Sequence, residues 1–141
     1  MHHAPLASTM VALGLLPVAV LYVHTFISGF KRLPGHRVTG LIAVMGDLAL
    51  SIGYMLYRSF GGRIGDSVFR PTGLVLDAFI VHGMIAVIVI LLELWVIVSA
   101  VHYHRTKTMY AHHRWMSKLM FVLWSLTFLS GELVYIALYI A

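Results

Sequence analysis

The stretch "LVLDAFIVHGMIAVIVILLELWVIVSAV", residues 74–101, decides the fold of this 141-residue chain. It is almost entirely apolar, and it is longer than the roughly 20 residues that a helix needs to cross a hydrocarbon core of about 30 Å. Segments 6–30, 38–57 and 115–140 have the same character. Hydrophobic residues make up 60% of the chain and charged residues 11%, whereas soluble domains carry about 25% charged residues. The sequence therefore predicts an all-α integral membrane four-helix bundle, a single domain over residues 1–141.

The loops of this predicted bundle carry most of its positive charge. Loops 31–37 and 102–118 together hold seven of the ten lysines and arginines, namely Lys31, Arg32, Arg37, Arg105, Lys107, Arg114 and Lys118. The positive-inside rule places both loops in the cytoplasm and both termini on the outer side, in what we expect to be a prokaryotic cytoplasmic membrane. This topology and contact with anionic lipid explain the net charge of +5. No nucleic-acid partner is needed.

The two halves of the chain show a weak similarity to each other. "GHRVTGLIAVMGDL" from Gly35 aligns with "HHRWMSKLMFVLWS" from His112 at an offset of 77 residues, and His24 aligns with His102 at an offset of 78. Duplication of a helical hairpin would explain the similarity. A chance match explains it equally well, because any two membrane hairpins share a basic turn.

Acidic residues inside apolar segments are costly in a membrane and usually face the interior of a bundle. Asp47 and Glu93 lie near the middle of their segments, so they can lie level with each other and share a proton or a hydrogen bond. His82 and Glu132 form a second level pair in the outer half. Tyr54 shares a helix face with Asp47. The alternative is that these polar residues only join the helices by hydrogen bonds.

The chain has no cysteine and nine histidines, so any metal would be bound by histidine, methionine or carboxylate. Axial ligation of haem b needs two neutral imidazoles on facing helices at similar depth. His36 and His113 match in depth, because both lie at the starts of the second and fourth helices, and His24, His82 and His102 are further candidates. Copper is an alternative, with His36, His82 and His113 as ligands beside methionine. Histidines beside basic turns also bind lipid phosphate or cap helices, and then no cofactor is bound.

Four stretches carry a resemblance to a known family: "GHRVTGLIAV", "YMLYRSFGG", "FIVHGMIAVIVI" and "HHRWMSKLMFVLWSLTFLSGELVYIALYI". In order and spacing, over residues 35–140, they resemble the small four-helix membrane proteins that include the haem-copper oxidase maturation factor CtaM. The resemblance implies that His36, His82 and His113 are functional positions and that the protein handles haem or copper. Members often carry a histidine at the end of the second helix, where this chain has Tyr54 and Tyr57.

These observations favour a membrane protein of respiratory or photosynthetic electron transfer that binds haem b. It would act as a redox accessory or as an oxidase maturation factor. A cofactor-free structural subunit of a larger redox complex, or a homo-oligomer, is the first alternative. A proton or cation pathway along Asp47, Glu93 and Glu132 is the second. The sequence contains no nucleophile triad, phosphate loop or zinc-protease motif, so we assign no catalytic residue and expect no stand-alone enzyme.

Overall fold

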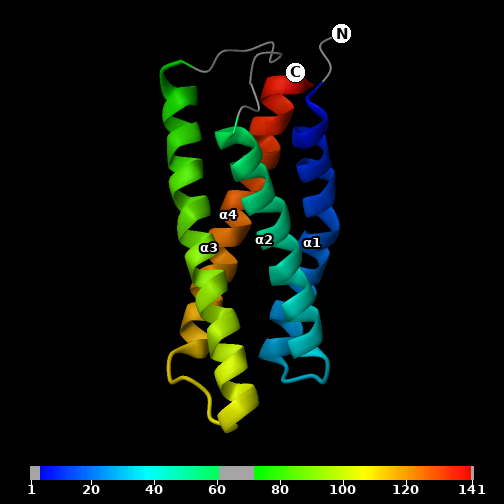
Figure 1. Ribbon diagram of the computed structural model, residues 1–141, viewed down its shortest axis with the longest axis vertical. Coiled ribbons are helices and arrows are strands. Elements are labelled where there is room, and N and C mark those ends of the chain that lie inside the picture. Colours follow the sequence, from blue (N-terminus) through cyan, green and yellow to red (C-terminus); the bar gives the residue numbers. More distant parts are fainter. Residues whose placement is uncertain (1–3, 61–71, 141) are drawn as a thin grey trace.

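The computed structural model describes residues 4–60 and 72–140. They form four α-helices, shown in Figure 1: α1 (Leu6–Phe30), α2 (His36–Ser59), α3 (Leu74–Thr106) and α4 (His113–Tyr139). Each helix is long and apolar enough to cross a membrane. The prediction of an all-α bundle of four membrane-spanning helices is therefore confirmed, and these helices indicate an integral membrane protein.

Three helices extend beyond the bounds expected from hydropathy. α2 begins at residue 36 rather than 38, α4 begins at 113 rather than 115, and α3 continues to 106 rather than 101. The added residues are mainly histidine, arginine and tyrosine, which continue a helix into the headgroup region without a glycine or proline to stop it. α3 ends at Thr106, and the next residue, Lys107, caps it with a left-handed backbone (φ 59°) and an N–H that it donates to the carbonyl of Tyr103. The α3–α4 connection is thus residues 107–112, much shorter than the loop 102–118 of the sequence prediction.

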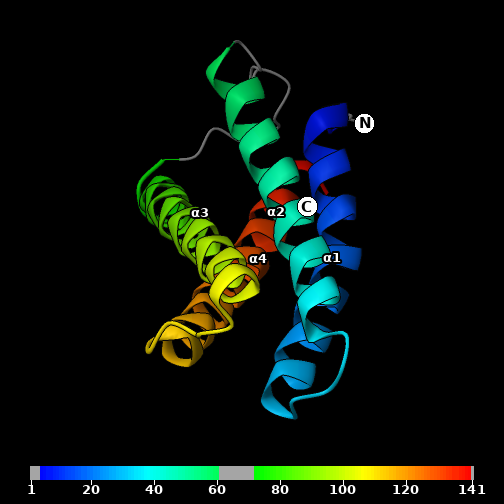
Figure 2. The ribbon, with the colours of Figure 1, turned by 60° about the horizontal axis from the view of Figure 1, so that its bottom comes forward.

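The chain folds as two helical hairpins, α1 with α2 and α3 with α4, which Figure 1 and Figure 2 both show side by side. The two hairpin turns lie at one end of the bundle, called the hairpin end below. The start of α1, the end of α2, the start of α3 and the end of α4 lie at the other end, called the terminal end. α2 and α4 both begin at the hairpin end, so they run parallel.

Small residues allow α1 and α2 to pack closely. A Cβ atom added to Gly46 would lie 3.2 Å from Val18 Cγ2, and one added to Gly40 would lie 3.1 Å from Thr25 Cγ2. Close approach of backbones at glycine is a common way to associate helices in a membrane, where apolar burial gives little driving force. The α1–α2 hairpin is therefore the most intimately packed pair of the bundle.

The bundle core lies between the hairpins and is built from Val18, Tyr22, Ala43, Val44, Leu48, Val89, Leu92, Met120 and Trp124. Large apolar side chains on all four helices point outward and are exposed, as lipid-facing residues would be. Each helix packs against two neighbours, in the cyclic order α1, α2, α3, α4. Within the described residues, α1 lies diagonally from α3, and α2 lies diagonally from α4.

Candidate functional site

A layer of four polar or aromatic side chains crosses the middle of the bundle, with one residue from each helix. Tyr22 on α1, Asp47 on α2, Glu93 on α3 and Trp124 on α4 are 3%, 4%, 0% and 4% exposed. Tyr22 donates its hydroxyl to Glu93 Oε1, and the Trp124 indole N–H donates to Asp47 Oδ1 at 2.9 Å. Both hydrogen bonds join diagonal helices, so this central polar layer links the two hairpins.

Aromatic stacking and a carboxyl contact complete the central polar layer. The Tyr22 and Trp124 rings stack with centroids 4.1 Å apart. The carboxyl groups of Asp47 and Glu93 lie within hydrogen-bonding reach of each other. Glu93 Oε2 receives no hydrogen bond from an N–H or hydroxyl group of the described residues. The structure thus brings together the two acids that their positions in the sequence place at the same depth.

A cavity of about 520 Å³ lies on the hairpin side of this layer, with Tyr22 in its wall. His36 and His113 line it from the diagonal helices α2 and α4. The remaining wall is mostly apolar and includes Phe26, Ala43, Val44, Val96, Ile97, Met120 and Phe121. We call it the hairpin-end cavity.

Both histidines of the hairpin-end cavity are held through the same ring nitrogen. His36 Nδ1 lies 2.9 Å from the carbonyl oxygen of Thr25, and because a carbonyl can only accept, Nδ1 carries the proton. His113 Nδ1 lies 3.0 Å from Ser99 Oγ. Neither Nε2 atom has a hydrogen-bond partner among the described residues. For His36 the Nε2 lone pair is therefore available to a ligand, in the arrangement typical of metal-bound histidines.

Basic residues line the hairpin-end cavity toward the end of the bundle. Arg37, Arg114 and Lys118 all contribute to its wall. The Arg37 guanidinium lies 4.3 Å from the centre of the Tyr103 ring, which positions its charge by a cation–π contact. An apolar cavity with a basic rim suits an amphipathic anion.

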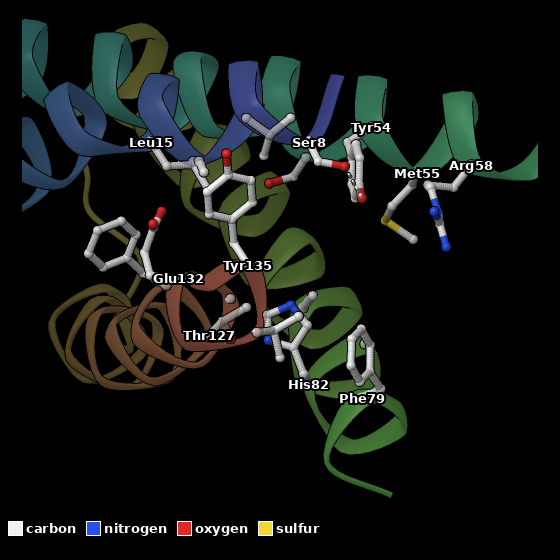
Figure 3. A pocket seen from close by; sticks show the side chains of 18 of the residues that line it. Ser8, Leu15, Tyr54, Met55, Arg58, Phe79, His82, Thr127, Glu132 and Tyr135 are labelled. Carbon is white, nitrogen blue, oxygen red and sulfur yellow. Dashed lines mark hydrogen bonds between the residues drawn. The ribbon is translucent and has the colours of Figure 1, made fainter. Parts of the chain in front are cut away.

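A second cavity of about 460 Å³ lies on the other side of the central polar layer, and we call it the terminal-end cavity. Asp47 and Trp124 of the layer line it, together with His82 from α3 and Glu132 from α4. Figure 3 shows His82 and Tyr135 on α3 and α4, across the cavity from Ser8 and Tyr54 on α1 and α2.

Hydrogen bonds fix the tautomer of His82. Ser130 donates its hydroxyl to the Thr127 carbonyl at 3.0 Å, so Ser130 Oγ must accept the hydrogen bond from His82 Nδ1, 2.8 Å away. His82 Nδ1 therefore carries the ring proton, and Nε2 has a free lone pair. The ring lies against Gly131, where an added Cβ would be 3.2 Å from its Cε1 atom.

The remaining predicted positions lie outside both cavities. His24 is on the exposed face of α1. His102 stacks on Tyr110 with ring centroids 4.4 Å apart, and its Nε2 is 3.3 Å from Thr108 Oγ1. The structure does not bring His24 and His102 together. His112 is exposed, next to half-buried His113.

No group of three or more histidine or acidic side chains is placed to hold a metal ion within residues 4–60 and 72–140. Met55 lines the terminal-end cavity, whereas Met45 and Met84 are more than half exposed on the outer surface. A copper site on these residues would therefore rest on fewer than three histidine or acidic ligands.

A short repeated motif that the sequence reasoning missed lies behind two of the histidines. "TFISG" at 25–29 on α1 and "TFLSG" at 127–131 on α4 differ at one position. In the first copy Thr25 and Gly29 contact His36, and in the second Ser130 and Gly131 contact His82. In each copy, one residue accepts a hydrogen bond from Nδ1 of the histidine, and the glycine leaves room for the imidazole ring. A search for repeated pentapeptides would have found it.

The offset of 77 residues seen in the sequence also relates residues that meet in space. His36 and His113 line one cavity, and Asp47 and Trp124 are joined by a hydrogen bond. In each pair the residues differ by 77 positions and come from the parallel helices α2 and α4. Any two parallel helices that start at the same end give one constant offset for residues level in depth, so the fold requires this offset with or without duplication.

Comparison of the chain with protein-family models, with curated proteins and with solved structures found no match. The functional assignment therefore rests on the residues of this chain.

Proposed function

We propose that this protein binds haem b in the hairpin-end cavity, where His36 and His113 would hold the iron. The observation that carries the proposal is that these two histidines line one cavity from diagonal helices at equivalent positions. Facing helices of a four-helix bundle commonly supply the ligands of a cofactor held in the bundle core. A bound haem would supply one-electron redox chemistry at this position.

The hydrogen-bond partners of His36 Nδ1 and His113 Nδ1 support iron ligation by these two residues. An iron ligand needs the lone pair of a neutral imidazole, and a hydrogen bond at the other ring nitrogen fixes the orientation of the ring. The Thr25 carbonyl does this for His36, and Ser99 Oγ is placed to do so for His113. These residues fit the cofactor.

The size and polarity of the hairpin-end cavity fit haem as well. Its volume of about 520 Å³ falls in the range of roughly 300–1,000 Å³ that is usual for cofactor pockets. The apolar wall suits a porphyrin ring, and Arg37, Arg114 and Lys118 would bind its two propionates as charge-assisted partners. Tyr22 of the central polar layer forms part of the cavity wall, and its ring stacks on Trp124.

The role we propose is that of a redox accessory or haem-copper oxidase maturation factor in a respiratory or photosynthetic membrane. The similarity of residues 35–140 to the family that includes CtaM supports this role. The resembling stretches include both histidines of the hairpin-end cavity and His82. A protein of four helices with a redox group would work beside other membrane subunits or as a homo-oligomer.

We propose further that the hairpin end faces the cytoplasm of a prokaryotic cell and that both termini lie outside. The basic residues near the hairpin turns support this orientation. Because the chain has no cysteine, single substitutions give a clean test. In intact cells, a membrane-impermeant thiol reagent should label Phe60→Cys at the terminal end and leave Leu33→Cys in the α1–α2 turn unlabelled. The opposite pattern would invert the topology.

A reduced-minus-oxidised visible spectrum of protein purified after haem-replete expression tests haem binding. We expect a bis-histidine b-type spectrum in the wild type and its loss in His36→Ala and His113→Ala. His112→Ala is the matched control, because His112 is exposed and adjacent to His113. That variant should keep the spectrum.

Absence of haem bands in the wild type would overturn the proposal. If such a haem-free protein copurified with a larger membrane assembly that stayed active in His36→Ala and His113→Ala, the chain would be a cofactor-free structural subunit. Retention of the spectrum in both alanine variants would place the haem elsewhere.

A proton pathway is the second candidate, and the Asp47–Glu93 contact favours it. A proton shared between the two carboxyl groups would supply the hydrogen bond that Glu93 Oε2 lacks. Asp47 opens onto the terminal-end cavity, and Glu93 bonds to Tyr22, which borders the hairpin-end cavity. Proton flux into proteoliposomes should fall in Asp47→Asn and Glu93→Gln, and unchanged flux would remove this candidate.

A further inference from the structure

We infer that the terminal-end cavity binds a hydroquinone, a lipid-soluble aromatic ring that carries two hydroxyl groups. The inference goes beyond haem binding, because it concerns the other cavity and a different ligand. It rests on the hydrogen-bonding capacity of His82 and Asp47, on the aromatic wall and on the opening of the cavity.

His82 offers a hydrogen-bond acceptor to the cavity. Its Nδ1 proton is committed to Ser130, whose own proton is committed to the Thr127 carbonyl. The Nε2 lone pair has no partner among the described residues. A ligand hydroxyl is the natural donor to it, because the half-buried ring presents an acceptor that none of the described residues uses.

Asp47 offers a second acceptor. Its Oδ1 takes the Trp124 indole N–H at 2.9 Å. Its Oδ2 has a long contact of 3.4 Å with Ser51 Oγ, which is beyond the usual range of about 2.5–3.0 Å for an O–H···O bond. The Glu93 carboxyl group also lies within reach of Asp47, but a carboxylate can accept about four hydrogen bonds, so Asp47 keeps capacity for a further donor. Since α2 contributes Asp47 and α3 contributes His82, the two acceptors come from different hairpins.

The rest of the cavity suits a ring with an alkyl tail. Phe79, Trp124 and Phe128 line it, and Trp124 and Phe128 lie parallel, with centroids 5.3 Å apart. Met55 on α2 and Gly83 on α3 also line the cavity, and both residues are exposed. Because α2 and α3 pack least closely of the neighbouring helices, a lipid-soluble ligand would enter from the bilayer between them.

The charges around the cavity favour an uncharged ligand that donates hydrogen bonds. Glu132 and Asp47 would attract a cation, but Arg58 also lines the cavity, and it lies 6.0 Å from the Tyr54 ring. The oxidised quinone has carbonyl oxygens and no hydroxyl proton, so it cannot donate to His82 Nε2. We therefore expect the reduced form to bind more tightly than the oxidised form.

Binding is tested by anaerobic titration calorimetry on the haem-free, full-length protein in detergent, with a decyl-substituted hydroquinone as the probe. The same ring with both hydroxyls methylated keeps the shape and lacks the donors, so it should bind at least tenfold more weakly. The corresponding quinone should also bind more weakly than the hydroquinone. These three ligands test the wild-type protein without any mutation.

Two variants test whether the hydroquinone binds in the terminal-end cavity. His82→Ala should weaken hydroquinone binding about tenfold, the effect of one lost hydrogen bond. His24→Ala, on the exposed face of α1, should leave binding unchanged. A thermal unfolding midpoint of His82→Ala equal to that of the wild type shows that the loss is local.

Equal binding of the hydroquinone and its dimethyl ether would overturn the inference, and so would unchanged binding in His82→Ala. Tighter binding of decylammonium than of the hydroquinone would overturn it too and would make the cavity a cation site. Because the protein is free of haem, none of these outcomes depends on the hairpin-end cavity. Failure of haem binding and failure of hydroquinone binding are therefore separate results.

Discussion

Replacing Gly29 by alanine should displace the His36 ring and weaken haem binding. A Cβ atom at position 29 would lie 2.4 Å from His36 Cε1 and 2.7 Å from its Nδ1. Non-bonded carbon atoms rest at about 3.5–4.0 Å, so the overlap is about 1 Å. An imidazole ring is rigid, and it would have to rotate away from α1. Rotation breaks the hydrogen bond to the Thr25 carbonyl, which fixes the ring.

The change in the free energy of unfolding of Gly29→Ala follows from these contacts. Holding the ring away from its preferred rotamer costs about 0.5–1.5 kcal/mol, and losing the hydrogen bond costs about 1 kcal/mol. The higher helix propensity of alanine returns up to about 1 kcal/mol. We expect Gly29→Ala to lower the free energy of unfolding by about 1 kcal/mol. Its affinity for haem should fall at least tenfold, as it does when the group that orients a ligating histidine is lost.

Gly53→Ala is the matched control. Gly53 lies inside α2, and an added Cβ there meets no atom within 4 Å. This variant should keep haem binding and gain up to about 1 kcal/mol from helix propensity. The two variants should then differ by about 2 kcal/mol in the free energy of unfolding.

Detergent-induced unfolding, followed by circular dichroism, measures the difference in stability, and haem titration into the haem-free protein measures affinity. Equal stability and equal haem affinity in the two variants would refute the reasoning, because the His36 ring could not then lie against Gly29.

Three further substitutions test the hydrogen bonds of the site. Trp124→Phe removes the indole donor to Asp47 and should lower the free energy of unfolding by about 1–3 kcal/mol, whereas Trp115→Phe, at a position 63% exposed, should change it little in the same assay. Tyr22→Phe leaves Glu93 without its donor and should cost a similar amount; thermal melts that overlay the wild type would show that this bond contributes nothing. Ser130→Ala removes the acceptor that fixes the His82 tautomer, and we expect hydroquinone affinity to drop in calorimetry while the helix content by circular dichroism stays the same.

The predictions that depended on depth agree with the structure, because depth follows from position along a helix. Asp47 and Glu93 lie near the middle of their segments, and the structure places their carboxyl groups within reach of each other. His36 begins α2 and His113 begins α4, so they share the hairpin end of the bundle. A rise of about 1.5 Å per residue converts these positions into depth without knowledge of the fold.

The direction in which a side chain points could not be read in the same way. His24 and His102 are related by an offset of 78 residues, almost the same as that of His36 and His113, yet they lie apart. The reason lies in Tyr22. Once its hydroxyl bonds Glu93 inside the bundle, a residue two positions further along the helix is turned by about 200°. His24 therefore points outward, and the sequence gives no sign that Tyr22 is the residue that sets this orientation.

The sequence by itself determined that the chain forms four apolar helices, which acids lie in mid-membrane and which histidines lie near the basic turns. Each of these properties is local, because it depends on the length of an apolar run and on counting along it. Tertiary structure alone decided that α1 lies diagonally from α3 and α2 from α4, and that the central polar layer separates two cavities. It also decided that His36 and His82 present a free Nε2. These features depend on which helix faces meet, and meeting faces are set by contacts between residues far apart in the chain, such as Trp124 with Asp47.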